Sequence, residues 1–162
     1  MVIKMNKLVV YFTYSGHTEK IVNLILDKIP VDVLKLNPIV PYSTDYDKVV
    51  EEEQNTSNFS KTVEIEKFNV DFSKYDEIIL GFGVWWYSIP PVIRTFLKEN
   101  GLRGKKIIPF TTNAGWLGRT FQEIRELCPN FIVTNEMNIV FKSYTDDLVT
   151  SSEEINKWIN SL

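Results

Sequence analysis

Two kinds of hydrophobic pattern alternate along the chain. Continuous runs of apolar, β-branched and aromatic residues are typical of strands buried on both faces of a sheet. Such runs, together with one partly alternating stretch, predict strands at residues 8–12, 31–36, 77–83, 106–110 and 131–140. Apolar residues at helical spacing predict the intervening and closing helices. The residues that carry this pattern are Ile21, Leu24, Ile25 and Ile29, then Val92, Ile93, Phe96 and Leu97, then Phe121, Ile124 and Leu127, and last Ile155, Trp158, Ile159 and Leu162.

Punctuating residues predict where these helices begin and end. Pro30 and Pro129 end two of them, because proline cannot continue a helix. Asn100-Gly101 is predicted to end the helix after the third strand. Ser151 begins the last helix with a capping box that Glu154 completes.

The segment between the second and third strands has a weaker pattern. Residues 45–58 are acidic and are predicted to be helical with Thr44 as the cap, while 60–74 is expected to be an extended loop. The order strand, helix, strand then repeats to a closing helix, which predicts a parallel sheet with helices on both faces. No repeat, low-complexity tract or linker divides the chain, so 1–162 is expected to be a single domain.

Composition excludes several classes of protein. The 162 residues carry a net charge of −3, whereas a nucleic-acid binder is usually basic, so no nucleic-acid partner is expected. One histidine and one cysteine, Cys128, leave no His-rich or Cys-based metal site, and Cys128 is predicted to lie in the core. The longest apolar run, 78–87, is far shorter than the roughly 20 residues of a membrane span. Because 1–13 does not resemble a signal peptide, we expect a cytoplasmic protein in which the sequons at Asn55 and Asn58 are not used.

Small polar residues fill the turn between the first strand and the first helix, 13–18. Ligands bind beyond the carboxyl ends of the strands in a sheet of this kind, and a helix start offers unpaired N–H groups and a partial positive charge. Gly16 lets the backbone curl so that several N–H groups converge, while Thr13, Ser15 and Thr18 add hydroxyl groups. We expect a cradle for one phosphate group, and an ordinary turn with a capping threonine is the alternative.

The absence of two phosphate-binding motifs from the sequence narrows the choice of ligand. A P-loop requires GxxxxGK followed by Ser or Thr, and Gly81-Phe82-Gly83 lacks the third glycine of a dinucleotide fingerprint. The turn therefore suits a terminal monophosphate better than a triphosphate or pyrophosphate. A response-regulator receiver would need acidic residues where Thr13 and Gly83 stand, and a cysteine-based phosphatase would need its cysteine in the first loop.

Two further loops carry aromatic residues at the same predicted edge. The third strand is followed by Trp85, Trp86 and Tyr87, which cannot all point into one core. At least one tryptophan is expected to face a flat ligand and one to pack under the loop, since large aromatic rings suit a ring-bearing ligand. The fourth strand is followed by small residues and Trp116, which offers another ring face; a tight turn with an exposed tryptophan is the alternative.

Together these loops resemble the FMN-binding loops of the flavodoxin family over nearly the whole chain. The turn 13–18 looks like the family's phosphate loop, with His17 where the family usually has Asn. The segment 111–119 looks like the third flavin loop, one residue shorter than the usual glycine-rich string. Pro41-Tyr42 and Asp45-Tyr46 are similar to the family's stretch after the second strand.

The segment that borders the isoalloxazine ring in such proteins resembles 80–90, but with two departures. The family more often has Pro where Gly83 stands and Gly where Tyr87 stands. The family's ring geometry, and with it the tuning of the flavin potential, is therefore not carried over to this chain.

The resemblance implies a three-layer flavodoxin-like fold, with a five-stranded parallel sheet in the order 2-1-3-4-5, and FMN as the cofactor. The first loop is implied to hold the phosphate, the second to border the ring, and the third to wall its pyrimidine side. No acid–base catalyst is implied, and His17 is expected to contact the phosphate. The implied cofactor-binding residues are Thr13, Tyr14, Ser15, Gly16, His17, Thr18, Val84, Trp85, Trp86, Tyr87, Thr112, Asn113, Ala114, Gly115 and Trp116.

Several functions remain open at this stage. The first is an electron carrier between redox partner proteins, which the single small domain favours, although a net charge of −3 is weak for electrostatic docking. The second is an FMN-dependent oxidoreductase that passes electrons from NADH or NADPH to a quinone-like acceptor, with Trp116, Tyr87 and Tyr42 lining the acceptor pocket. The third is a flavodoxin-like domain that has lost its cofactor.

Overall fold

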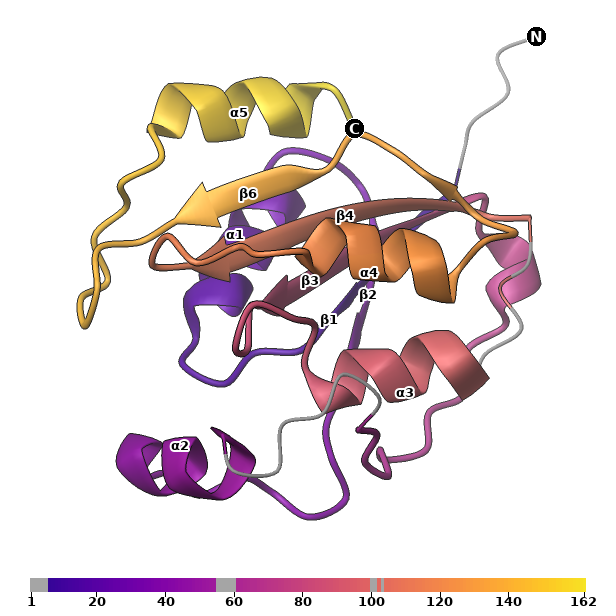
Figure 1. The fold of residues 1–162 in the computed structure, drawn as a ribbon. Coiled ribbons are helices and arrows are strands. Elements are labelled where there is room, and N and C mark those ends of the chain that lie inside the picture. The colour runs from indigo at the N-terminus through magenta and orange to yellow at the C-terminus, as the bar shows by residue number, and fades with distance from the viewer. Residues whose placement is uncertain (1–5, 55–60, 100–101, 103) are drawn as a thin grey trace, which may run out of the picture.

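A parallel sheet forms the middle layer of the computed structural model, which describes residues 6–54, 61–99, 102 and 104–162 (Figure 1). Its path runs β2-β1-β3-β4-β5, with β6 also paired to β4, and every pairing between these strands is parallel. The predicted order 2-1-3-4-5 is therefore confirmed. The strands are β1 (Lys7–Tyr11), β2 (Asp32–Lys35), β3 (Glu77–Gly83), β4 (Lys106–Asn113), β5 (Ile132–Val133) and β6 (Met137–Val140).

The predicted fifth strand is interrupted. In the register, β5 lies beside the start of β4 and β6 lies beside its end. Between them Asn135 has a φ of 54°, a left-handed conformation that breaks an extended backbone. The predicted strand 131–140 therefore lies where it was expected, but it consists of two strands rather than one. The fourth strand is also longer than predicted, since it continues past Phe110 to Asn113.

The helices largely follow the predicted pattern. Ser151 caps the last helix, because its hydroxyl accepts from the amide of Glu154 at 3.2 Å. The second helix starts differently, since the carboxylate of Asp45, rather than Thr44, accepts from the amide of Asp47 at 3.0 Å. The elements are α1 (His17–Leu26), α2 (Tyr46–Gln54), the 3₁₀ helix η1 (Phe72–Lys74), α3 (Pro91–Glu99), α4 (Thr120–Leu127) and α5 (Ser152–Asn160).

Some sequence-based predictions fall outside the described residues. They concern the helix terminator Asn100-Gly101, the end of the predicted helix at 55–58 and the sequons at Asn55 and Asn58. The neighbouring stretch from 61 to 71 is loop, as predicted, apart from an isolated bridge between Ile65 and Pro38, and η1 follows it. Within the described ranges, no helix is both long enough and apolar enough to cross a membrane.

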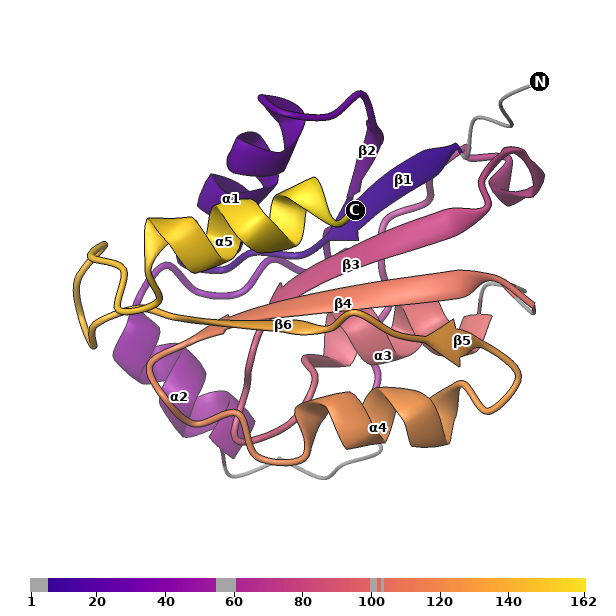
Figure 2. The same cartoon turned by 90° about the horizontal axis from the view of Figure 1, so that it is seen from above.

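The four sheet-covering helices form two layers, with α1 and α5 on one face and α3 and α4 on the other (Figure 2). Alternate residues of the central strands supply the two cores. Leu8 and Val10 pack in the core on the α3 side, while Val9 packs in the core on the α1 side. Cys128 lies in the first of these cores, as predicted, and burial raises the pKa of its thiol to about 11.

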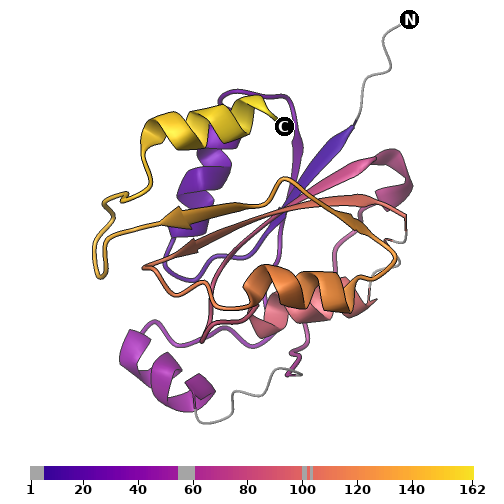
Figure 3. The ribbon, with the colours of Figure 1, turned by 45° about the horizontal axis from the view of Figure 1, so that its top comes forward.

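Helix α2 belongs to neither layer. It lies beyond the carboxyl ends of the strands, beside the loops that follow β4 and β6 (Figure 3). Because the loops after β1 and β3 also leave the sheet at this edge, five segments of the chain converge there.

Candidate functional site

These five segments enclose a cavity of about 460 Å³, within the usual range for small-molecule sites. The cavity is bordered mainly by aromatic and aliphatic side chains, with hydroxyl and amide groups among them. Its lining residues are Tyr14, Ser15, His17, Tyr46, Val49, Val50, Gly83, Val84, Trp85, Trp86, Tyr87, Thr112, Asn113, Ala114, Trp116, Phe141, Lys142, Ser143 and Tyr144.

The structure brings most of the predicted site residues together around this cavity. They come from all three predicted loops, namely Tyr14, Ser15, His17, Val84, Trp85, Trp86, Tyr87, Thr112, Asn113, Ala114 and Trp116. The remaining predicted residues, which are Thr13, Gly16, Thr18 and Gly115, are not among the residues that line the cavity.

The turn before α1 leaves the first amides of the helix without a side-chain cap from any described residue. Gly16 has a φ of 96°, which favours glycine, and its amide donates to Oγ1 of Thr13 at 3.0 Å. Within the described part of the chain, no side chain caps the start of α1, in contrast to Ser151 at the start of α5. Uncapped amides and the positive end of a helix, beside the exposed Ser15, make this end of the cavity suitable for an anion.

The hydroxyl group of Thr18 has a structural partner. It lies 2.8 Å from Oγ1 of Thr112, and the Thr18 side chain is buried. Thr18 was predicted to offer its hydroxyl to a ligand, and in the structure that hydroxyl joins α1 to β4.

His17 connects the start of α1 with the loop after β6. Its Nε2 lies 2.9 Å from Oδ1 of Asp146, and its ring stacks on Phe141 with centroids 4.1 Å apart. Lys20 adds a hydrogen bond from Nζ to the carbonyl of Asp146 at 3.1 Å. These contacts fix the loop after β6 against the predicted phosphate end of the cavity.

A tight turn presents the aromatic residues after β3. The amide and carbonyl groups of Trp85 and Ser88 bond reciprocally at 2.9 and 3.0 Å. The two residues between them, Trp86 and Tyr87, have φ values of 48° and 64°, the signs of a type I′ turn. Gly118 lies against this turn, since a Cβ there would stand 2.5 Å from Cβ of Tyr87.

The ring of Trp85 lies between the cavity and the core. Its centroid lies 4.9 Å from that of Tyr42, 5.9 Å from Phe12 and 6.2 Å from Tyr14, each with a steeply tilted edge contact. The rings of Trp86 and Trp85 meet edge-on, with centroids 5.8 Å apart. Both tryptophans therefore line the cavity, and Trp85 also packs over the core.

Tyr14 and Tyr42 both contact the ring of Trp85, which forms part of the cavity wall. Tyr14 donates its hydroxyl to the carbonyl of Ser43 at 2.6 Å, and burial raises the pKa of its phenol, so it remains a neutral donor. Tyr42 does not line the cavity. Burial raises the pKa of Tyr42, and the charge of Glu53 raises it further.

The loop after β4 is ordered by its own amide side chain. Oδ1 of Asn113 accepts from the amide of Gly115 at 2.8 Å, and Nδ2 donates to Asn138 at 2.5 Å. Gly115 has a φ of 115°, so the loop turns sharply there. The result places Ala114 and Trp116 on the cavity while Gly115 stays behind them.

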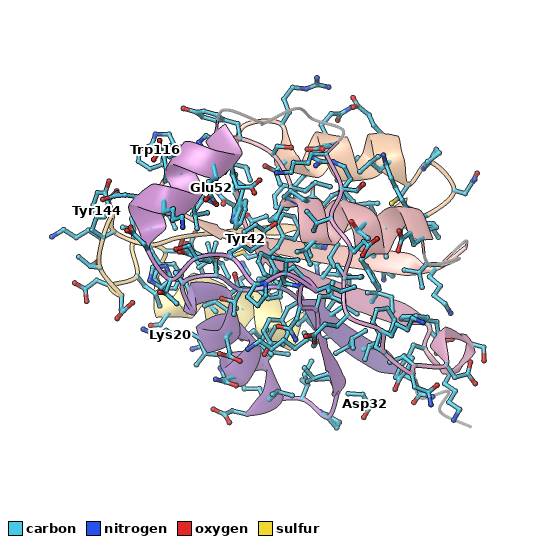
Figure 4. The ribbon with its side chains drawn as sticks, turned by 90° about the horizontal axis from the view of Figure 1, so that it is seen from below. Lys20, Asp32, Tyr42, Glu52, Trp116 and Tyr144 are labelled. Atoms are coloured by element: carbon cyan, nitrogen blue, oxygen red, sulfur yellow. The ribbon has the colours of Figure 1, made fainter. Side chains whose placement is uncertain are left out.

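Sequence reasoning missed Gly83 at the end of β3 and two groups of lining residues, from α2 and from the loop after β6. The first comprises Tyr46, Val49 and Val50, and the second comprises Phe141, Lys142, Ser143 and Tyr144. The second group directly follows the last strand. Because ligands bind beyond the carboxyl ends of the strands in a sheet of this kind, that position could have identified the group from the sequence. Tyr144 is 94% exposed, Trp116 57% and Tyr46 55%, and Figure 4 shows Tyr144 and Trp116 at the end of the molecule occupied by α2.

The cavity thus suits a flat ring with an anionic group. Aromatic rings wall one part, and the uncapped start of α1 supplies donors at another. Across the described ranges, no cluster of three or more His, Cys, Asp and Glu side chains is placed to hold a metal ion.

Comparisons with known proteins give a consistent picture. A family model described as flavodoxin matches residues 6–162. A candidate flavoprotein from Bacteroides uniformis ATCC 8492 is similar in structure with a TM-score of 0.79 and 21% identity, over 96% of this chain and 98% of that one. A flavoprotein in complex with FMN from Lactobacillus acidophilus NCFM is similar with a TM-score of 0.71 and 21% identity, over 96% and 99%. A comparison with curated proteins finds no match.

Proposed function

Because the chain belongs to the flavodoxin family, we propose that it binds FMN in the cavity at the carboxyl edge of the sheet and acts in electron transfer. The observation that carries this proposal is the uncapped start of α1 beside an aromatic-walled cavity. The flavoprotein from Lactobacillus acidophilus NCFM, which was crystallised with FMN, supports the choice of cofactor. When bound, FMN supplies the redox chemistry, and the protein supplies binding, orientation and electrostatics.

The start of α1 would hold the phosphate group. The exposed hydroxyl of Ser15 and the first amides of the helix are the donors available to it. His17 lies at the same end, with Asp146 and Phe141 fixing its ring. These donors form one cradle, which suits one phosphate, and the chain lacks the glycine fingerprint of a pyrophosphate site; this is the reason to expect FMN in preference to FAD.

The aromatic turn and the loop after β4 would hold the ring. Trp85, Trp86 and Tyr87 provide one wall, and Ala114 and Trp116 provide another. These side chains would shield the ring from water, and the amides of the turn would give it a polar environment.

An electron carrier is the function that we place first. The exposed rings of Tyr144, Trp116 and Tyr46 stand at the rim of the cavity, where a partner protein would approach the cofactor. The partner is expected to be a redox protein, and the cytoplasmic location expected from the sequence remains a prediction.

An FMN-dependent NAD(P)H:quinone-type oxidoreductase is the second candidate. Two of the residues expected to line its acceptor pocket, Trp116 and Tyr87, are more than half exposed and border the cavity. The third, Tyr42, lies behind Trp85 and does not line the cavity, which weakens this candidate. Loss of the cofactor is disfavoured by a cavity that is already formed.

The test begins with the absorbance spectrum of the purified protein and identification of any flavin released on denaturation. Apoprotein is then titrated with FMN and FAD while flavin fluorescence is followed. Tighter binding of FAD, or binding of neither flavin, would contradict the proposal. Steady-state reduction of a quinone by NADH or NADPH, with no other protein present, would establish the oxidoreductase instead of the carrier.

A further inference from the structure

A largely buried ion pair lies beneath the aromatic turn. Nη2 of Arg94 on α3 lies 2.6 Å from Oε1 of Glu123 on α4. Their side chains are only 2% and 15% exposed. Removing two charges from water is expensive, and a buried pair is often no more stabilising than apolar residues of the same size. Its presence therefore calls for a role beyond stability.

The pair is bonded to the base of the turn. Glu123 uses its second oxygen, Oε2, to accept from the hydroxyl of Ser88 and from the amide of Ile89, the latter at 3.2 Å. Nη2 of Arg94 donates to Oγ of Ser88 at 3.1 Å and to the carbonyl of Ile89 at 3.3 Å. The polar groups where the chain leaves the turn thus converge on one arginine and one carboxylate.

The turn needs such a support. Trp86 and Tyr87 both have positive φ values, which large side chains rarely adopt and which cost free energy unless the surroundings enforce them. The reciprocal bonds between Trp85 and Ser88 close the turn but do not orient it with respect to the sheet. The ion pair supplies that orientation, because it belongs to two helices that are packed on the sheet.

None of the three supporting residues lines the cavity. The turn residues Trp85, Trp86 and Tyr87 do, whereas Ser88, Arg94 and Glu123 stand behind them. Any influence of the network on a ligand must therefore pass through the turn.

We propose that Ser88, Arg94 and Glu123 are positioning residues that hold the aromatic turn in the conformation required by the flavin ring. Through the turn they set the affinity for FMN and the midpoint potential of the bound flavin. The proposal rests on the proposed function, in that FMN is the ligand of the cavity.

The decisive variant is Ser88→Ala. It removes one hydroxyl and leaves the ion pair of Arg94 with Glu123 in place, so the fold is expected to survive. Glu123→Gln is the second variant, since it keeps the size of the side chain and removes its charge. The matched control is Glu136→Gln, which removes a carboxylate that pairs with Arg125 of α4 and does not line the cavity.

Two measurements use bound FMN. We expect Ser88→Ala to weaken FMN binding about tenfold, because the turn is then no longer held in the conformation that receives the ring; tenfold is about 1.4 kcal/mol, the order of one internal hydrogen bond. The midpoint potential should shift in both network variants and stay at the wild-type value in Glu136→Gln. A network that serves stability alone would leave the potential of Ser88→Ala unchanged, and that result would overturn the proposal.

A third measurement needs no flavin. In apoprotein, hydrogen exchange at the amides of Trp85 and of position 88, each relative to its intrinsic rate, should be faster in Ser88→Ala than in wild type. The amide of Val84, which bonds to the carbonyl of Thr112 at 3.0 Å, provides the internal control and should not change. Unchanged exchange at the turn would overturn the proposal whether or not FMN binds. Failure of wild type to bind FMN would refute the proposed function separately.

Discussion

The hydroxyl groups of Thr18 and Thr112 are hydrogen-bonded to each other, Oγ1 to Oγ1 at 2.8 Å, where the first turn of α1 meets the end of β4. Both side chains are buried. The bond joins α1, whose start is proposed to hold the phosphate, to the end of β4, which leads into a loop proposed to hold the ring. The relative position of these two parts of the site therefore depends on it.

Thr18→Val should therefore destabilise the protein. The variant keeps the branched shape of the side chain but leaves the hydroxyl of Thr112 buried without its partner, which costs about 1–3 kcal/mol. Urea denaturation of the apoprotein measures the loss. Ser15→Ala is the control, because the Ser15 side chain is exposed and its removal should change the free energy of unfolding by less than about 0.5 kcal/mol. Equal stability of Thr18→Val and wild type would show that the buried bond is not needed.

Ser15→Ala should instead affect binding. Its hydroxyl is exposed at the start of α1, where we propose the phosphate group, and a hydrogen bond to a charged group contributes about 1.5–3 kcal/mol. We expect the variant to weaken FMN binding by that amount and to leave the affinity for riboflavin, which lacks the phosphate, unchanged. Fluorescence titrations with both flavins measure the difference. Equal losses for the two flavins would place the phosphate elsewhere.

Much of the fold could be predicted because its signals are local. The apolar run 77–83 coincides with β3, and the capping box at Ser151 forms as expected. The cap of α2 could not be chosen from the sequence, since Thr44 and Asp45 are adjacent and both suit the role. The break at Asn135 was also hidden, because a single left-handed residue leaves no mark on the hydrophobic pattern.

The site was predictable only where its loops follow recognisable strands. Tyr144 and Phe141 follow the interrupted last strand, and they reach the cavity because β6 pairs in parallel with β4 and ends at the same edge of the sheet. The role of Glu123 could likewise not be predicted from the sequence. From the sequence alone, Glu123 on α4 resembles any other surface charge, and only the packing of α3 beside α4 makes it the partner of the buried Arg94.

Two glycines of β3 should respond oppositely to alanine. A Cβ at Gly81 would stand 2.2 Å from the ring of Phe110, in a core that cannot yield that space. A Cβ at Gly83 would meet Thr112 at 3.7 Å, an ordinary contact. We therefore expect Gly81→Ala to cost about 1–3 kcal/mol.

Gly83→Ala should be neutral or stabilise the strand by about 0.5–1 kcal/mol, because alanine has less freedom to lose on folding. Thermal and urea melts of the two apo variants measure both effects. A destabilised Gly83→Ala would show that the end of β3 lacks the room that the contact distances indicate.

The last prediction separates the two tryptophans of the turn. The ring of Trp85 contacts Tyr42, Phe12 and Tyr14 and belongs partly to the core. Its replacement by alanine should cost about 3 kcal/mol through the cavity it leaves. Trp86 makes its ring contact, within the described part of the chain, with Trp85 at the cavity wall.

Trp86→Ala should therefore melt near the wild-type temperature as apoprotein and yet bind FMN more weakly and with a shifted midpoint potential. Trp85→Ala should melt early in the same thermal scan. The two measurements together, an apo melt and a redox titration of the loaded protein, distinguish a ring that borders the ligand from one that supports the turn. If both variants melted early while affinity and potential stayed at wild-type values, the aromatic turn would be part of the core, and the flavin ring would have to lie against another wall of the cavity.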